Sequence, residues 1–417
     1  MKKFLFTIAF LGLLAVNATA QNSNETENQE TGGLSDFLSQ VLQEQHAQTV
    51  SHRQGVAVGF ISTVHGTFDG AQVSFINTIT NDAKGAQVGF INTTRGSYNG
   101  GQVGFINSVT SSVRGAQVGY VNTAAGDVNG AQVGFVNTAI GEVSGAQVGF
   151  VNTATKDVDG FQVGFVNTTI GEVSGAQVGF VNTATKDVDG LQVGFVNTAV
   201  GDCNAQIGFV NVATGDVNGQ VGFVNITAGE VDAQIGFVNT ARKLNGLQLG
   251  FVNFADTIEN GVSIGFLSIV RQGGFRAVEV GISEFHLVNV GFKLGVERFY
   301  TTFSISYNPF EDYRSKSFAT GFGFGTIVPI NDSFFFNPEI IGSTSWSRNT
   351  RNLTSFVPHF GYNLGNHFSV TLAPSVTWSR SPRNMDLLEP IFYVANFEID
   401  DRNAIVVGAR LNLRVRF

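Results

Sequence analysis

One nine-residue phrase, G-A-Q-V-G-F-V-N-T, returns with small variations through the middle of the chain. Its aromatic residue recurs every 15 residues through the first ten copies, every 14 residues for four steps, and after 15 residues at the last copy. A unit this short cannot bury a hydrophobic face alone, so successive units must stack on one another. The fifteen aromatic positions are Phe60, Phe75, Phe90, Phe105, Tyr120, Phe135, Phe150, Phe165, Phe180, Phe195, Phe209, Phe223, Phe237, Phe251 and Phe266.

Each unit has room for two short strands and two turns, which together make one coil of a narrow β-solenoid. Alternation places Ala131, Val133, Phe135 and Asn137 on one face of the main strand and the residues between them on the other. Each strand then pairs with its copy in the next coil, about 4.8 Å away, so the rod extends roughly 70 Å. We predict that the phenylalanines stack inside the coil.

Two amide columns accompany the aromatic one. The glutamines run from Gln72 to Gln248 and the asparagines from Asn77 to Asn253, each at the repeat interval. Stacked amide side chains can hydrogen-bond from coil to coil. We predict an asparagine ladder at the bend and a glutamine ladder along the face. Both should survive the shorter units, because the missing residue lies between the asparagine and the glutamine.

An alternative makes each repeat one transmembrane strand of a large antiparallel barrel. A spanning strand needs about 9–11 residues with every second one apolar. Each unit offers only Ala131, Val133 and Phe135, or their equivalents, before Asn137 interrupts the face. The connections are also all alike, whereas bacterial barrels alternate short turns with long loops. The pattern therefore favours the solenoid.

The N-terminal segment has the layout of a secretory signal peptide: Lys2 and Lys3, an apolar run, and a small-residue ending at Ala20. Helical spacing of apolar residues predicts an amphipathic helix over 34–47, which either caps the first repeat or binds a partner. The predicted domains are a signal peptide at 1–20, a flexible tether with the capping helix at 21–54, the repeat solenoid at 55–270 and an outer-membrane β-barrel at 271–417.

The last part of the chain loses the repeat and gains longer alternating stretches. At 403–417, leucine, valine and phenylalanine alternate with arginine and asparagine, which suits a wall with lipid outside and water inside. Eight antiparallel strands are predicted near 275–284, 286–297, 299–307, 317–328, 333–346, 353–364, 366–379 and 403–417, with 390–399 either a ninth strand or part of a loop. Interfacial aromatic girdles are predicted from Tyr300, Tyr307, Trp346, Tyr362, Trp378 and Tyr393.

The ending of the chain resembles the assembly signal of bacterial outer-membrane barrels, with Leu411, Leu413 and Val415 before a terminal Phe417. The repeat G-x-Q-V-G-F-V-N-T resembles the glycine-rich surface repeats of diderm bacterial envelope proteins. These resemblances imply the outer membrane as location, and membrane lipid and the barrel assembly machinery as partners. The order of segments also resembles autotransporters, but the C-terminal segment is too short for the barrel and linker helix of that family.

Catalysis and cofactor binding have no candidate in the sequence. The six histidines are scattered without metal-ligand spacing, and no nucleophile-elbow, phosphate-loop or zinc-protease motif occurs. Cys203 is the only cysteine, so no disulfide framework exists. The net charge of −8 argues against nucleic acid as a partner. We therefore expect a non-enzymatic protein without cofactors or a metal centre.

One acidic column is a candidate binding edge. Its plain interpretation is a solvated edge that discourages aggregation, and calcium binding is an alternative because oxygen ligands are present without a full coordination loop. The column consists of Asp127, Glu142, Asp157, Glu172, Asp187, Asp202, Asp216 and Glu230.

The sequence favours an all-β surface protein with a structural, adhesive or display role, anchored by the barrel. A surface protein or a glycan is the candidate ligand. A channel in which the repeats supply membrane strands is the alternative function, and a periplasmic solenoid that recruits envelope partners is a third hypothesis.

Overall fold

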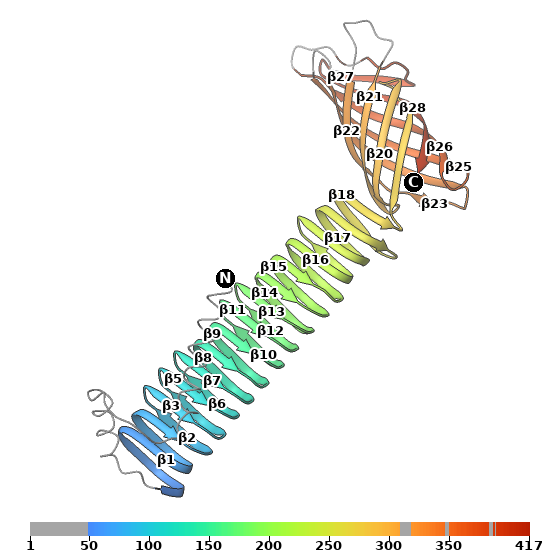
Figure 1. Ribbon diagram of the computed structural model, residues 1–417. Helices are drawn as coiled ribbons and strands as arrows, with labels where there is room; N and C mark the ends of the chain where they lie inside the picture. The colour runs from blue at the N-terminus through green and yellow to red at the C-terminus, as the bar shows by residue number, and fades with distance from the viewer. Residues whose placement is uncertain (1–48, 309–317, 347–349, 383–386, 388) are drawn as a thin grey trace, which may run out of the picture. The chain divides into compact units, whose positions relative to one another are not determined.

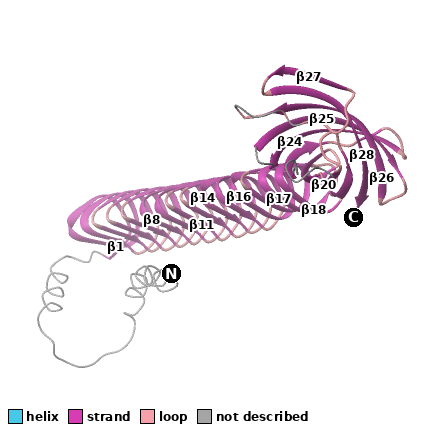
Figure 2. Ribbon diagram, turned by 90° about the horizontal axis from the view of Figure 1, so that it is seen from above, coloured by secondary structure: helices cyan, strands magenta, loops and turns pink. Residues whose placement is uncertain are grey.

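The structure is a computed structural model that describes residues 49–308, 318–346, 350–382, 387 and 389–417. Strands and loops make up all of this, and in these residues no helix is long and apolar enough to cross a membrane (Figure 2). The predicted signal peptide and the predicted helix at 34–47 lie outside the described residues. The first strand begins at Thr49, within the segment predicted as a tether.

A parallel β-solenoid of about 14 turns forms the first part of the described chain, with its coils stacked one after another (Figure 1). Its strands are β1 (Thr49–Ile79), β2 (Ala83–Val88), β3 (Ile91–Thr94), β4 (Tyr98–Val103), β5 (Ile106–Val109), β6 (Val113–Val118), β7 (Val121–Ala124), β8 (Val128–Ala139), β9 (Val143–Ala154), β10 (Val158–Val163), β11 (Val166–Thr169), β12 (Val173–Val178), β13 (Val181–Ala184), β14 (Val188–Ala199), β15 (Cys203–Ala213), β16 (Val217–Ile235), β17 (Val238–Ile258) and β18 (Val262–Gln272).

Neighbouring coils pair in parallel and in repeat register. Gln132 lies opposite Gln147, and Asn137 lies opposite Asn152. Register shifts in the shorter units fall between the two ladders, as between Val188 and Leu191, so the glutamine and asparagine pairings continue. Stacking in register is therefore confirmed. Parallel pairing also rules out the alternative in which the repeats are antiparallel strands of one large barrel.

The predicted interior of the coil is wrong in two respects: the phenylalanines point outward, and the glutamines predicted along the face lie inside. Phe135 is 41% exposed, whereas Gln132 and Asn137 are 0% exposed. In several coils the chain bends at a corner here, as at Gly89 and Phe90 between β2 and β3, and a Cβ at the equivalent Gly134 would lie 2.1 Å from a backbone oxygen of the preceding coil. Phe135 and Val136 both point away from the interior after this corner, so the alternation shifts by one residue. The narrow interior holds amides and small apolar side chains instead of rings.

A closed eight-stranded antiparallel barrel forms the C-terminal part. Strand β28 pairs with both β26 and β19, which closes the cylinder. The segment 390–399, predicted as either a ninth strand or part of a loop, contributes to β27, which pairs with the first part of β28. The strands are β19 (Phe275–Ile282), β20 (Val288–Val296), β21 (Phe299–Tyr307), β22 (Phe318–Gly325), β23 (Val328–Pro329, paired with β24), β24 (Phe334–Trp346), β25 (Thr350–Asn363), β26 (Phe368–Arg380), β27 (Ala395–Asp400) and β28 (Asn403–Arg416).

The barrel wall has the predicted apolar outside and polar inside. On β28, Leu411 and Leu413 are exposed while Arg414 is buried. Tyr300 departs from the prediction of an outward girdle, because it is fully buried and its hydroxyl donates to Glu339. The other five aromatic residues predicted for the girdles are exposed or half-exposed: Tyr307, Trp346, Tyr362, Trp378 and Tyr393.

Candidate functional site

Two amide ladders hold the solenoid interior. Asn137 Nδ2 donates to Asn152 Oδ1 at 2.8 Å and to the Val148 carbonyl at 2.9 Å, and Asn137 Oδ1 accepts from Asn122. Gln147 Nε2 donates in the opposite direction, to Gln132 Oε1 of the preceding coil, at 2.8 Å. The asparagine ladder runs from Asn77 to Asn253 and the glutamine ladder from Gln72 to Gln248. These side chains are fully engaged, so they support the rod and do not form its binding surface.

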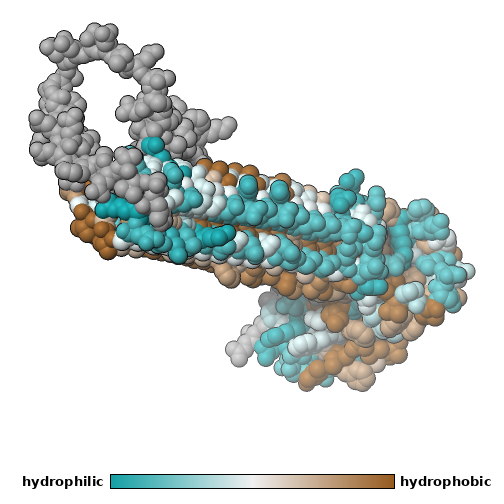
Figure 3. Space-filling model, turned by 90° about the horizontal axis from the view of Figure 1, so that it is seen from below, coloured by the Kyte–Doolittle hydropathy of each residue, from teal (hydrophilic) through white to brown (hydrophobic). Residues whose placement is uncertain are grey.

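The binding surface that the solenoid offers is apolar. We use the term Val–Phe face for the outward columns at the positions of Asn129, Ala131, Val133 and Phe135 in each coil. Val133 is 40% exposed and Phe135 41% exposed, and equivalents in other coils are similar. Figure 3 shows that hydrophobic and hydrophilic side chains lie in separate rows along the solenoid. The sequence missed this face because the fifteen aromatic residues were assigned to the core.

The aromatic rings of this face cover one another. Successive ring centroids lie 4.8 to 5.2 Å apart and the rings are within 7° of parallel, from Phe60 to Phe266. Because each ring face is occupied by its neighbours, only the ring edges are presented outward. A ligand that stacks on a ring face, such as a sugar, has no access inside this column.

The acidic column lies at exposed or half-exposed turns, and part of it caps the backbone. Asp157 Oδ1 accepts the Glu172 backbone N–H at 2.8 Å, and Asp187 Oδ1 accepts that of Asp202 at 2.9 Å. Asp127, Asp202 and Asp216 accept the corresponding N–H groups of the next coils. Aspartate at these positions therefore stabilises turns, and calcium has no gathered site there among the described residues.

At the end of that column, Glu230 is held by neighbours from the next coil. Asn245 Nδ2 donates to Glu230 Oε2 at 2.8 Å, and Lys243 Nζ lies 3.0 Å from Glu230 Oε1. The hydrogen bond from Asn245 and then that from Lys243 keep the pKa of Glu230 below its usual value. Several carboxylates of the predicted binding edge are thus already hydrogen-bonded or ion-paired within the solenoid.

The barrel interior contains a cluster of buried charged residues whose pairing was not predicted from the sequence. Lys293 Nζ contacts Glu339 and lies 3.2 Å from Glu279 Oε1. Arg414 Nε donates to Glu279 Oε2 at 2.8 Å, and Arg414 Nη2 donates to Asn337 Oδ1 at 2.6 Å. Two carboxylates therefore meet two cations, and the cluster is balanced without a further ion.

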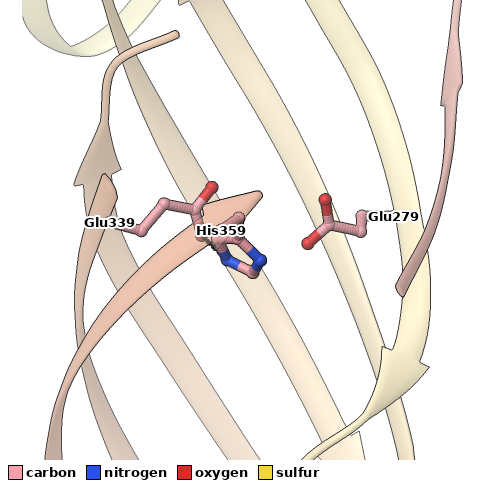
Figure 4. A group of neighbouring side chains, drawn as sticks. All are labelled: Glu279, Glu339 and His359. Carbon is pink, nitrogen blue, oxygen red and sulfur yellow. Dashed lines mark ion pairs between the residues drawn. The ribbon is translucent and has the colours of Figure 1, made fainter. Parts of the chain in front are cut away.

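Among the described residues, one group of side chains could hold a metal ion. It consists of Glu279, Glu339 and His359, whose ligand atoms lie within 4.8 Å of one another. Figure 4 shows these side chains approaching one another from different strands. A divalent ion at this point would have to displace the ammonium group of Lys293. The cluster is better explained as a plug of ion pairs across the barrel.

A second buried cluster lies along the interior. Glu284 accepts from Arg410 Nε at 3.1 Å and from Arg410 Nη2 at 2.9 Å, and it also accepts from Ser375 and Thr377. A cavity of about 60 Å³ lined by residues of both clusters, including Glu279, Lys293 and Arg410, has room for a few water molecules. The lumen is filled by side chains, as expected for eight strands.

Cys203 gives a direct test of how tightly the coils pack. Its side chain is buried in β15, and this burial raises the pKa of the thiol to about 12. We expect no reaction with a water-soluble aromatic disulfide reagent at pH 8 in the folded protein, because the thiolate is the reactive form. One thiol per chain should react after unfolding in guanidinium. Rapid labelling of the folded protein would show that this coil is open.

No family model matches the sequence, and comparison with curated proteins gives no match.

Proposed function

We propose that the barrel anchors this protein in the outer membrane of a diderm bacterium and that the solenoid serves as a structural, adhesive display module. The observation that supports this proposal best is the barrel wall, which is apolar outside and charged inside. Leu372, Phe360 and Ile340 are each more than half exposed, whereas the buried Lys293 and Arg414 face the interior. A soluble barrel would expose the charged residues and bury the apolar ones.

Exposed aromatic residues near the ends of the barrel strands support the same location. Trp346 is 55% exposed and Trp378 49% exposed, and each donates from its indole Nε1 to a polar side chain of a neighbouring strand. Amphipathic rings of this kind are enriched at membrane–water interfaces. The terminal Leu411, Leu413 and Phe417 are likewise exposed, as an outward assembly signal for the barrel machinery requires.

The location is tested by membrane fractionation and protease treatment of intact cells. We expect the chain in the outer-membrane fraction, with a barrel that migrates differently in gels before and after boiling. Protease added to intact cells should remove the solenoid and leave the barrel. Full protection of the solenoid until the outer membrane is permeabilised would assign it to the periplasm instead. Recovery from the soluble fraction would contradict the anchoring role.

A further inference from the structure

We propose that the Val–Phe face binds the same face of a second copy of this chain, with the two solenoids antiparallel. The surface available is large enough. Over twelve coils, the valine and phenylalanine columns expose about 1,500 Å² of apolar surface, taking side-chain areas of about 150–250 Å², whereas a stable interface needs about 800 Å² per partner. Monomeric proteins rarely leave more than about 300–600 Å² in one apolar patch.

The spacing of the face points to a second copy as the occupant. Its ridges are ring edges and valine side chains that repeat at about 4.9 Å, with ring planes parallel throughout. Another solenoid of the same sequence has ridges at the same interval, so the ridges of the two copies stay in step, coil opposite coil, along the whole contact. A partner with a different period would match only over a few coils.

Charges at the edge of the face select the antiparallel arrangement. A two-fold axis along the strands sets each column against the same column of the second copy and reverses the order of coils. With the axis between the coils of Asn129 and Ser144, Arg114 faces Asp159 of the second copy. Lys84 then faces Asp189. The four side chains are exposed, and Lys84, Arg114 and Asp159 take part in no ion pair with other described residues.

The remaining members of this edge column fit the same arrangement. Asp69 faces Asn204, Asn99 faces Ser174, and Asn129 faces Ser144, so no two like charges meet within this column. A parallel pair about an axis along the rods would set this charged column against the phenylalanine column at the opposite edge of the face instead. Electrostatic complementarity of this kind fixes the register of an interface more than its strength.

The alanine column also matches in size. Among the coils from Ala71 to Ala205, Phe161 and Leu191 are the large side chains that replace alanine, and Phe161 is 58% exposed. In the antiparallel register, Phe161 faces Ala116 and Leu191 faces Ala86. Gly101, in the coil next to that of Ala116, bears no side chain. A large side chain on one copy thus meets a small one on the other, in both halves of the contact.

If the barrel lies in the outer membrane as proposed above, antiparallel pairing has a defined consequence. The C-terminal coil of each solenoid is followed by its barrel, so the two barrels are connected to opposite ends of the paired solenoids. The second copy would then sit in a facing membrane, and the interaction would join two cells through identical chains.

Pairing is tested with the full chain in lipid nanodiscs at one copy per disc. We expect sedimentation of paired discs at micromolar protein, and electron micrographs with the two discs at opposite ends of each pair. Discs at the same end would contradict the antiparallel arrangement. Single discs at every concentration would overturn the proposal, and solenoids lying on the lipid would make a membrane surface the occupant of the face.

Charge reversal tests the register. Arg114→Asp alone and Asp159→Arg alone should each weaken self-association about tenfold, because like charges then meet twice in every pair. An equimolar mixture of the two variants should pair as strongly as the wild type, since each introduced aspartate then meets an introduced arginine. Arg95→Asp, a change of the same kind outside the face, is the matched control. Equal association of all variants, or a mixture as weak as the single variants, would overturn this register.

These outcomes do not depend on the cellular location. Sedimentation measures pairing wherever the protein resides, and protease treatment of cells measures location whether or not the solenoids pair. A failed localisation test with intact pairing would leave a self-associating solenoid, and the reverse result would leave an anchored display protein with another partner.

Discussion

Replacing Asn137 by leucine is expected to destabilise the solenoid by about 3–5 kcal/mol, since three buried hydrogen bonds are lost and their partners are left unsatisfied. The side chain is fully buried and bonds to Asn122, to Asn152 and to the Val148 carbonyl. Leucine also has a tetrahedral branched carbon where asparagine has a planar amide, and the coil has no spare room for the wider side chain. Far-UV circular dichroism during urea titration would measure the loss.

Asn129→Leu is the matched control, because Asn129 belongs to the same coil and is exposed. Its effect on the free energy of unfolding should stay within about 0.5 kcal/mol. Hydrogen exchange should also separate the two variants, with faster exchange confined to the coils beside Asn137, since solenoid coils contact mainly their neighbours. Equal effects of the two substitutions would show that the amide ladder contributes little.

The second large effect is expected in the barrel. Arg414→Met should destabilise it by about 3–5 kcal/mol, the usual result of removing one member of a buried ion pair. Glu279 would keep only Lys293, which it shares with Glu339, and the Asn337 Oδ1 that accepts from Arg414 would lose that donor. Both tryptophans of the chain, Trp346 and Trp378, lie in the barrel, so their fluorescence reports its unfolding alone.

Two further variants make this result specific. Arg402→Met changes an exposed arginine beside the same strand and should have little effect. Glu279→Gln combined with Arg414→Met removes one charge of each sign, leaves Lys293 with Glu339, and should recover part of the lost stability. A double variant no more stable than Arg414→Met would mean that packing around the arginine, and not charge balance, is what matters.

The solenoid was predictable from the sequence because its information is local and repeated. The aromatic spacing fixed the length of a coil, and the glutamine and asparagine columns predicted ladders that the structure contains. The direction of Phe135 was wrong for a physical reason. Strict alternation holds only along a regular strand, and in several coils the chain bends at the glycine and the aromatic residue, as at Gly89 and Phe90. A glycine repeated just before the aromatic residue was the signal for this corner.

The barrel could be predicted as a set of strands but not as a set of contacts. Alternation identified all eight strands and placed the arginines of the last one inside. The pairing of Arg414 with Glu279, or of Lys293 with Glu339, depends on which strands are neighbours and on how the cylinder closes. Nothing in the local pattern around these residues specifies their partners, which lie far away in the sequence.

The uniform amide ladder makes whole coils interchangeable. The segments 141–160 and 171–190 are identical in sequence, and both present the same ladder residues to their neighbours. Deleting the 30 residues from one to the other would rejoin matching ends and shorten the rod by two coils, roughly 10 Å, without an unpaired amide. The length of the rod is therefore a quantity that such a chain can alter in steps of whole coils, while every remaining contact inside the rod stays the same.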